Sequence, residues 1–276
     1  MNSGRSKSSK SAVIVSDIHD GDDHAVCTES PEKIDGENYV PNKIQQTLLE
    51  TWKEAWKDLI QKKPNIIVVN GEPVNGANRR NLGAGVWSTN LVDQIRDFKK
   101  LMKFAPKSNK LLFIRGSGYH VTVDGATPIE EIVAEELKAD RYRAFGGSGF
   151  TDDEATIEMH GKYFNFTHHV GFAQWAQYKP TSLAKEMVKL HFDQGKREHT
   201  DVTIRSHVHY YVEIRFPNTL GFTTPAWKLP DSFMYRRGIP AIPDIGLMEV
   251  IIESNGKIIV EPHITSVDLK PKVMHV

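Results

Sequence analysis

The chain has 276 residues, of which 39% are hydrophobic, and its 35 Lys and Arg residues balance its 35 Asp and Glu residues. This length can bury one full hydrophobic core without a second domain. A formal net charge of zero excludes a whole-molecule field that would attract nucleic acid or an anionic membrane. No apolar run approaches the roughly 18 residues of a membrane span. The single cysteine, Cys27, excludes an intramolecular disulfide and suits a reducing compartment, so we expect a soluble cytoplasmic protein with no membrane contact.

The two ends of the chain differ from its middle in amino-acid composition. Residues 1–11 are rich in Ser and Lys with no apolar stretch behind them, which predicts a disordered basic arm rather than a secretory signal. No shift in composition interrupts residues 12–265, so we expect a single domain there. Residues 266–276 are expected to form a C-terminal tail.

The first half of this domain alternates short apolar runs with amphipathic segments. Residues 12–16, 66–69 and 111–114 are apolar runs typical of strands covered on both faces. Apolar residues at helical spacing predict helices at about 42–62, 89–104 and 128–138, with Asn42 as an N-cap and Pro128 at the first helical position. The acidic, polar segment 20–42 is expected to be a long loop. Alternating strands and helices predict a mainly parallel sheet with right-handed crossovers.

The second half is richer in strands. Residues 154–159 and 163–167 alternate in polarity around His160–Gly161–Lys162, which predicts a hairpin. A helix is expected at about 181–193, and further strands at 202–204, 211–216, 220–224, 247–253 and 257–263. Asn255–Gly256 between the last two runs is a strong hairpin signal. We therefore expect an α/β fold in which two β-sheets pack face to face with helices outside.

Polar clusters follow five of the expected strands. Ligands of α/β sheets bind beyond the carboxyl ends of the strands, and imidazole and carboxylate groups are ligands for Mn²⁺, Fe and Zn²⁺. A histidine at any one of these positions is more often a hydrogen-bonded core or surface residue. Five clusters in order, each at a strand end, favour a metal centre, and a bridging carboxylate would allow two metals. The clusters are Asp17 with His19, Glu72 with Asn75, His120, His168 with His169, and His207 with His209.

Taken in order, these clusters resemble the motifs of the calcineurin-like metallophosphoesterases, which are D-x-H, G-D-x-x-D, G-N-H-D/E, a lone His and G-H-x-H. The resemblance covers about residues 12–263 and is closest to a phage-encoded branch of that family. Arg115–Val121 matches the R-G-x-x-x-H-V pattern of this branch, and Arg205–His209 matches its R-S-H-V-H. Thr224–Trp227 and Pro243–Gly246 also look like that branch. The resemblance implies the family's fold, a four-layer αββα sandwich of two mixed sheets flanked by helices.

The resemblance also implies a set of roles. It implies hydrolysis of a phosphomonoester or phosphodiester, with nucleic acid among the candidate substrates, by a hydroxide bound to two divalent metal ions. For a phage protein, the compartment would be the cytoplasm of the host. Asp17, His19 and His209 would hold one metal, with Asp17 in a position to reach both. Glu72 would take the bridging position, and His207 with either His168 or His169 would hold the second metal. We favour His168 as the ligand, which leaves His169 to contact phosphate, and His120 as the group that stabilises the transition state or protonates the leaving group.

Three positions depart from the family pattern. Glu72 replaces the bridging Asp and adds one methylene to it. Asn75 replaces the second Asp of that motif and removes a charge. Ser117 takes the place of the Asn ligand; in the alternative alignment, Gly118–Tyr119–His120 matches G-N-H and Tyr119 replaces that Asn. These changes leave open a second hypothesis, a binding or scaffold protein that keeps the fold with one metal or none.

Two basic or aromatic segments have competing interpretations. Arg79 and Arg80 are either solvated loop charges or contacts for phosphate or nucleic acid. A nucleic-acid-binding module that uses them and the basic arm is the least favoured hypothesis, because the net charge is zero. Residues near the C-terminus either line a binding groove or form packing and a solvated turn; packing is favoured. They are Trp227, Phe233, Tyr235, Arg236 and Arg237.

Overall fold

The computed structural model describes residues 9–77, 82–118, 127–173, 175–193, 195, 198–231, 234, 236, 243–267 and 274. The expectations for Arg79, Arg80, His120, Phe233, Tyr235 and Arg237 lie outside these residues. None of the described helices is both long and apolar enough to cross a membrane.

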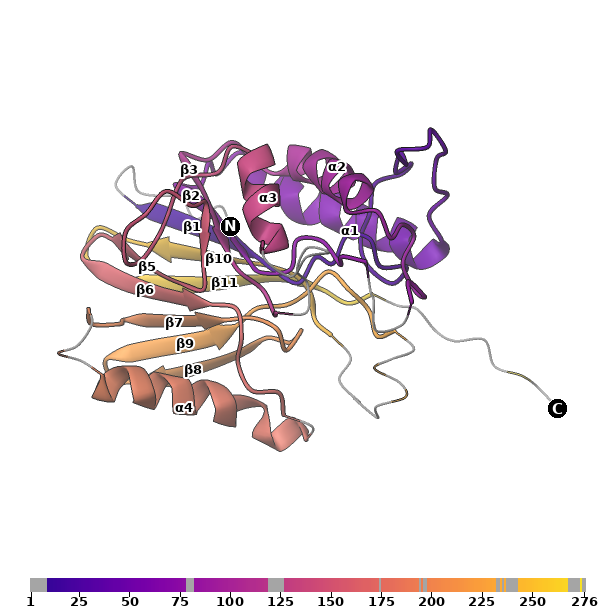
Figure 1. The fold of residues 1–276 in the computed structure, drawn as a ribbon. Helices are drawn as coiled ribbons and strands as arrows, with labels where there is room; N and C mark the ends of the chain where they lie inside the picture. The colour runs from indigo at the N-terminus through magenta and orange to yellow at the C-terminus, as the bar shows by residue number, and fades with distance from the viewer. Residues whose placement is uncertain are drawn as a thin grey trace.

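Two mixed β-sheets form the centre of the molecule (Figure 1). The six-stranded sheet has the order β11 (Ile258–Thr265), β10 (Ile245–Ile252), β1 (Lys10–Val15), β2 (Ile66–Asn70), β3 (Lys110–Ile114) and β4 (Thr151–Asp152). The five-stranded sheet has the order β5 (Glu154–Met159), β6 (Lys162–Thr167), β7 (Val202–Arg205), β9 (Thr219–Thr223) and β8 (Val212–Phe216). Strands β1 to β4 are parallel, as are β6, β7 and β9, whereas β10, β11, β5 and β8 pair in antiparallel fashion.

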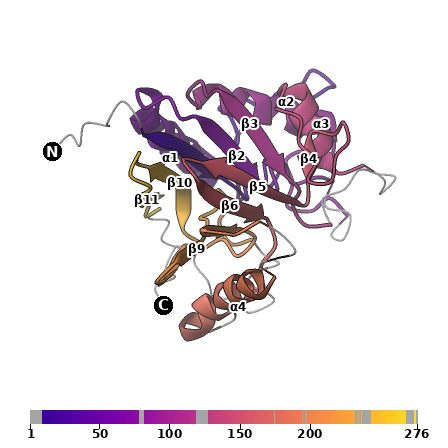
Figure 2. The same cartoon turned by 90° about the vertical axis from the view of Figure 1, so that its left-hand side faces the viewer.

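Helices cover the outer face of each sheet. Figures 1 and 2 show α1 (Lys43–Ile60), α2 (Leu91–Leu101) and α3 (Ile129–Glu136) on one side of the sandwich. The helix α4 (Lys179–Phe192) lies on the opposite side, against the five-stranded sheet. Short 3₁₀ segments at Met102–Phe104 and Ala176–Tyr178 adjoin α2 and α4. The expected architecture of two packed mixed sheets flanked by helices is confirmed.

The apolar strand β1 contributes side chains to two hydrophobic cores, because successive side chains of a strand point to opposite faces of the sheet. Val13 and Val15 belong to the core that the first sheet shares with α1, α2 and α3. Ala12 and Ile14 belong to the core between the two sheets. This arrangement explains why β1 shows a continuous apolar run rather than an alternating one.

The expected element ends differ from the observed ones by a few residues. Strand β1 starts at Lys10, inside the segment expected to be a disordered arm. Pro128 is the N-cap of α3 rather than its first helical residue. Asn42 caps α1 as expected, and it does so in a capping box with Gln45. Strand β4 was not expected, because a run of two residues carries no periodic signal.

Trp227 packs in the interior rather than in a groove. It is fully buried, and its ring centroid lies 4.7 Å from that of Trp52 on α1. The packing interpretation of this residue therefore holds, while Arg236 is exposed.

Candidate metal centre

The predicted ligand residues gather beyond the carboxyl ends of four strands, two from each sheet. Asp17 and His19 follow β1, and Glu72 follows β2. His168 follows β6 in the second sheet, and the pair His207 and His209 follows β7. Backbone hydrogen bonds tie these loops together: the His19 N–H donates to the carbonyl of Glu72 at 3.0 Å, and the Ser206 N–H donates to that of His168 at 2.8 Å.

The backbone at this cluster is left-handed at five ligand positions. Asp17 and His19 have φ of 51°, Glu72 has 54°, His207 has 73° and His209 has 58°. Residues other than glycine seldom adopt this backbone conformation, which costs them about 1–2 kcal/mol each. Five of the nine described non-glycine residues with positive φ are therefore concentrated in one site. Such concentration of strain marks functional sites, where the surrounding structure holds the backbone in place.

One ligand group consists of Asp17, His19, Glu72 and His209. A ligand atom from each lies within 4.8 Å of the others. His19 Nε2 is 2.7 Å from Glu72 Oε2, and His209 Nε2 is 3.3 Å from Asp17 Oδ1. The rings of His19 and His209 lie 5.4 Å apart between centroids. Two carboxylates and two imidazoles therefore converge on one small volume.

A second ligand group consists of Glu72, His168 and His207, and it shares Glu72 with the first. His168 Nε2 is 3.4 Å from Glu72 Oε1 and 3.8 Å from Asp17 Oδ1. His168 Nδ1 lies 2.7 Å from the carbonyl oxygen of Asn70. Because a carbonyl only accepts, Nδ1 carries the proton and Nε2 is turned toward the carboxylates. Gly71 makes room for this ring, since a Cβ there would overlap His168 Nδ1.

Ser117 contacts the shared carboxylate. Its hydroxyl donates to Glu72 Oε1 at 2.5 Å, and its backbone N–H donates to the same oxygen at 3.2 Å. The preceding Gly116 donates its N–H to Glu130 Oε1 at 2.9 Å, and a Cβ at Gly116 would lie 2.5 Å from Glu72 Cγ. Ser117 therefore holds Glu72 by hydrogen bonds.

A chain of buried polar side chains runs beneath the ligands and joins the two sheets. Asn70 Nδ2 donates to Ser206 Oγ at 2.7 Å, and the Thr224 hydroxyl donates to the same oxygen at 2.7 Å. Ser16 Oγ lies 2.6 Å from Thr224 Oγ1. Ser16 and Ser206 directly precede Asp17 and His207, so this chain fixes the points where the ligand loops leave their strands.

Burial and mutual charge set the protonation of the cluster. Burial alone would raise the pKa of Asp17, but the charges of His168 and His209 outweigh it and lower that pKa to about 2. Burial would lower the pKa of His168, whereas Asp17 and Glu72 raise it to about 9. Burial lowers the pKa of His207 to about 4, so this ring is a neutral imidazole at pH 7. Ionised carboxylates beside a neutral imidazole are a ligand set for divalent cations.

Several buried polar atoms of these residues make no hydrogen bond with any described residue. They are Asp17 Oδ1, His168 Nε2, His207 Nδ1 and His209 Nδ1. Buried polar atoms are otherwise nearly always satisfied. Unsatisfied atoms on residues of two adjoining ligand groups fit the binding of cations there.

The other predicted site residues are placed as follows. His169 is exposed, and its ring centroid lies 4.6 Å from that of His207, at the surface of the cluster. Asn75 is buried, and its backbone N–H donates to the carbonyl of Asp20 at 2.8 Å. His120 lies outside the described residues.

The sequence reading missed the supporting residues. Asn70, Ser16, Ser206 and Thr224 gave no metal-ligand signal, although each stands at or just past the carboxyl end of a strand. A polar residue at the last position of an otherwise apolar strand, as at Asn70, is the signal that could have identified them.

No protein-family model matches the sequence, and no match was found among curated protein sequences. The structure is similar to solved ones of low sequence identity. An archaeal phosphodiesterase is 13% identical, with 91% of this chain and 99% of that chain covered and a TM-score of 0.43. The phosphoesterase YfcE from E. coli is 10% identical, with 90% and 96% covered and a TM-score of 0.41. Vps29 from Entamoeba histolytica, solved in complex with Zn²⁺, is 10% identical, with 91% and 97% covered and a TM-score of 0.40.

Proposed function

We propose that this protein is a metal-dependent phosphoesterase that hydrolyses a phosphomonoester or phosphodiester, with nucleic acid among the candidate substrates. The observation that carries this proposal is that one carboxylate, Glu72, belongs to both ligand groups. A shared carboxylate places two cations close together, as hydrolysis of phosphate esters requires of a two-metal site.

The residues suit two divalent cations, of which Mn, Fe and Zn fit the donor atoms. Asp17, His19 and His209 would hold one with Glu72, and His168 and His207 would hold the other with the same carboxylate. When bound, the cations would polarise the phosphoryl group and make water a stronger nucleophile at neutral pH.

His169 is the side chain best placed to meet the substrate. It is exposed beside His207, so its ring could donate a hydrogen bond to a phosphoryl oxygen. His120 is assigned by resemblance to the same task or to protonation of the leaving group. The match of Arg115–Val121 to the phage-encoded branch, and one buried cysteine, Cys27, support a phage origin and a cytoplasmic setting as part of this proposal.

Turnover of bis-p-nitrophenyl phosphate with Mn²⁺ tests the proposal. The His209→Ala variant should lower the rate by more than about 100-fold, because it removes a ligand of the first group. His191→Ala, an exposed histidine on α4, is the matched control and should retain full activity. Absence of turnover by the unmodified protein with each of Mn²⁺, Ni²⁺, Co²⁺ and Zn²⁺ would contradict the proposal.

A second candidate function is a binding or scaffold protein that keeps the fold but not the chemistry. The neutral residues Asn75 and Ser117, which stand where the family has an acid and a metal ligand, favour it. Elemental analysis of the purified protein separates the two functions. Two metals per chain support the enzyme, and none supports the scaffold.

A further inference from the structure

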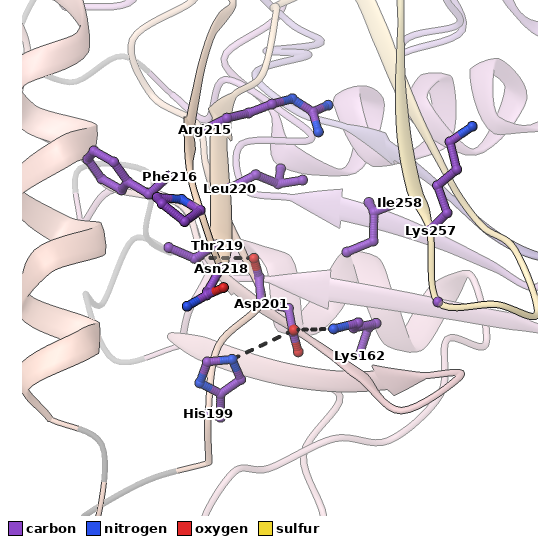
Figure 3. A pocket seen from close by; sticks show the side chains of 12 residues that line it. Lys162, His199, Asp201, Arg215, Phe216, Asn218, Thr219, Leu220, Lys257 and Ile258 are labelled. Carbon is purple, nitrogen blue, oxygen red and sulfur yellow. Dashed lines mark hydrogen bonds and ion pairs between the residues drawn. The ribbon is translucent and has the colours of Figure 1, made fainter.

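A polar pocket with a volume of about 500 Å³ lies at the opposite end of the two sheets from the candidate metal centre. It is formed between the turn that joins β8 to β9 and the turn that joins β10 to β11 (Figure 3). Its lining includes Lys162, the first residue of β6, and Asp201, which directly precedes β7. A Cβ at Gly256 would lie 3.7 Å from Lys162 Cε, so the pocket is at a seam between the sheets.

Three cationic side chains from three separate segments line this pocket. Lys162 starts β6, Arg215 is on β8, and Lys257 follows the β10–β11 turn. The only carboxylate among the lining residues is Asp201. The neutral amide of Asn218, on the rim, adds a further donor. The formal charge of the lining is therefore positive in a molecule whose overall formal charge is zero.

The carboxylate is already committed within the protein. Asp201 Oδ1 lies 2.8 Å from Lys162 Nζ, and Oδ2 accepts from the backbone N–H of Tyr163 at 2.9 Å. Arg215 pairs with Glu213, its neighbour on the same face of β8. Lys257 makes no ion pair with any residue that the structure describes, so its charge is not neutralised within that part of the chain. Asp201 thus orients Lys162. The ammonium group of Lys257 and the Nη atoms of Arg215 remain for a ligand.

A single phosphate group cannot contact this pocket and the metal centre at once. The six residues of β6 separate Lys162 from His168. At roughly 3.3 Å per residue, that is about 20 Å.

We propose that this pocket binds an anion carrying two or more linked phosphate groups, such as the phosphate chain of a nucleoside diphosphate. Charge-assisted hydrogen bonds from Arg and Lys are the strongest contacts that proteins make with phosphate. Arg adds a rigid fork of donors that matches phosphate oxygens. Lys257 and the Nη atoms of Arg215, on different walls of a pocket of about 500 Å³, suit a chain of phosphates better than a single one.

The probes are inorganic pyrophosphate and adenosine diphosphate, titrated calorimetrically into the full-length protein in buffer that contains EDTA. Chelation keeps the metal centre from contributing to phosphate binding. Both probes should bind once per chain, and orthophosphate should bind at least about tenfold more weakly. Lys257→Glu and Arg215→Glu should each weaken pyrophosphate binding by about tenfold or more.

Two variants distinguish a site from general attraction. Lys43→Glu makes the same charge change at an exposed position on α1 and should leave binding unchanged. His209→Ala, in the metal centre, should also leave it unchanged, so this test is independent of the proposed phosphoesterase activity. The inference is overturned if pyrophosphate does not saturate the protein, if Lys43→Glu weakens binding as much as Lys257→Glu, or if His209→Ala abolishes it.

Discussion

At the scale of single residues, Ser117 shows how a neutral hydroxyl can support the candidate metal centre. Its hydroxyl and backbone N–H both donate to Glu72 Oε1, the oxygen on the side of His168. Ser117→Ala removes the hydroxyl donor and leaves the longer Glu72 side chain less restrained. Loss of such a supporting contact commonly lowers metal affinity by about 10- to 100-fold. We expect at least about a tenfold loss in Mn²⁺ affinity, measured by calorimetric titration of the metal-free protein.

The control for this prediction is Ser117→Thr, which keeps a hydroxyl at the same position. It should retain most of the metal affinity. Equal affinity in Ser117→Ala and the unmodified protein would show that the serine does not position Glu72.

The sequence predicted which side chains form the candidate metal centre but not the backbone that presents them. Residue type and position after a strand indicated Asp17, His19, Glu72, His168 and the R-S-H-V-H pair. Their left-handed φ values could not be predicted, because nothing in a carboxylate or imidazole favours that conformation strongly. It arises from tertiary hydrogen bonds, such as that between the Asp17 N–H and the Gly71 carbonyl, at 3.2 Å.

At the scale of elements, the end of α3 offers a direct stability test. The Lys138 N–H donates to the Glu135 carbonyl at 3.0 Å, and the Ala139 N–H donates to that of Ala134 at 2.9 Å. These are the two bonds of a Schellman motif, which needs a left-handed residue after the C-cap. Lys138 holds that position with φ of 55° although glycine is preferred there. Lys138→Gly should therefore stabilise the protein by about 1 kcal/mol, measured by urea unfolding.

The matched control is Lys138→Ala, which removes the exposed side chain but keeps the Cβ that strains the backbone. It should give no gain in the free energy of unfolding. A gain equal to that of Lys138→Gly would place the effect in the lysine side chain rather than in its φ.

Glu131 joins α3 to the short strand β4. Its carboxylate accepts from the Phe150 N–H at 2.7 Å and from the Thr151 hydroxyl at 2.6 Å. Burial alone would raise its pKa, but these hydrogen bonds and Arg143 outweigh it and lower the pKa below 4.5. A carboxylate with a lowered pKa in the folded state stabilises the protein above its unfolded pKa, and that stability is lost as the pH falls through the folded pKa.

Glu131→Gln should therefore cost about 2 kcal/mol at pH 7, because it weakens charge-assisted hydrogen bonds. The difference from the unmodified protein should shrink as the pH falls from the ordinary pKa of glutamate through the lowered pKa of folded Glu131, because the carboxylate of the unmodified protein then becomes protonated. Urea unfolding of both proteins at pH 7 and at acid pH measures it. A difference that stays constant across this range would show that the charge of Glu131 is not responsible.

A helix or strand could be predicted where the residues of that segment alone determine its structure. The apolar stripe of Leu48, Trp52, Trp56 and Leu59 was sufficient to predict the helix α1, and Asn42 was sufficient to predict where it starts. Strand β4 is formed by pairing of Thr151 and Asp152 with the end of β3, a contact distant in sequence. Such a strand depends on its partner rather than on its own composition.

At the scale of the whole molecule, the site depends on how the two sheets are joined. Asp17 and Glu72 follow strands of one sheet, and His168 and His207 follow strands of the other. A rotation of one sheet against the other would separate the ligand groups. The core between the sheets is apolar and has no directional bonds, so it does not fix this orientation closely. The buried chain of Asn70, Ser206, Thr224 and Ser16 does have directional bonds and crosses from sheet to sheet.

Thr224 is the link of this chain that can be removed with little change in shape. It is fully buried, its hydroxyl donates to Ser206 Oγ, and it lies within hydrogen-bond distance of Ser16 Oγ. Thr224→Val keeps the branched shape and the backbone N–H but leaves two buried hydroxyls without this partner. We expect a loss of about 1–3 kcal/mol in the free energy of unfolding. We also expect about a tenfold loss in Mn²⁺ affinity, because Ser16 and Ser206 precede the proposed ligands Asp17 and His207.

Thr203→Val is the matched control for this prediction. Thr203 is also buried in the second sheet, but its hydroxyl makes no hydrogen bond with any described residue. Replacing an unsatisfied buried hydroxyl by a methyl group should leave the stability unchanged or raise it, with metal affinity unaltered. Unfolding in urea gives the first quantity for both variants, and calorimetric titration of Mn²⁺ gives the second. If Thr224→Val lowered stability but bound Mn²⁺ as tightly as Thr203→Val, the hydroxyl chain would support the fold without orienting the ligands. A loss of both quantities in Thr224→Val alone would show that the contact between the sheets is what holds the two ligand groups together.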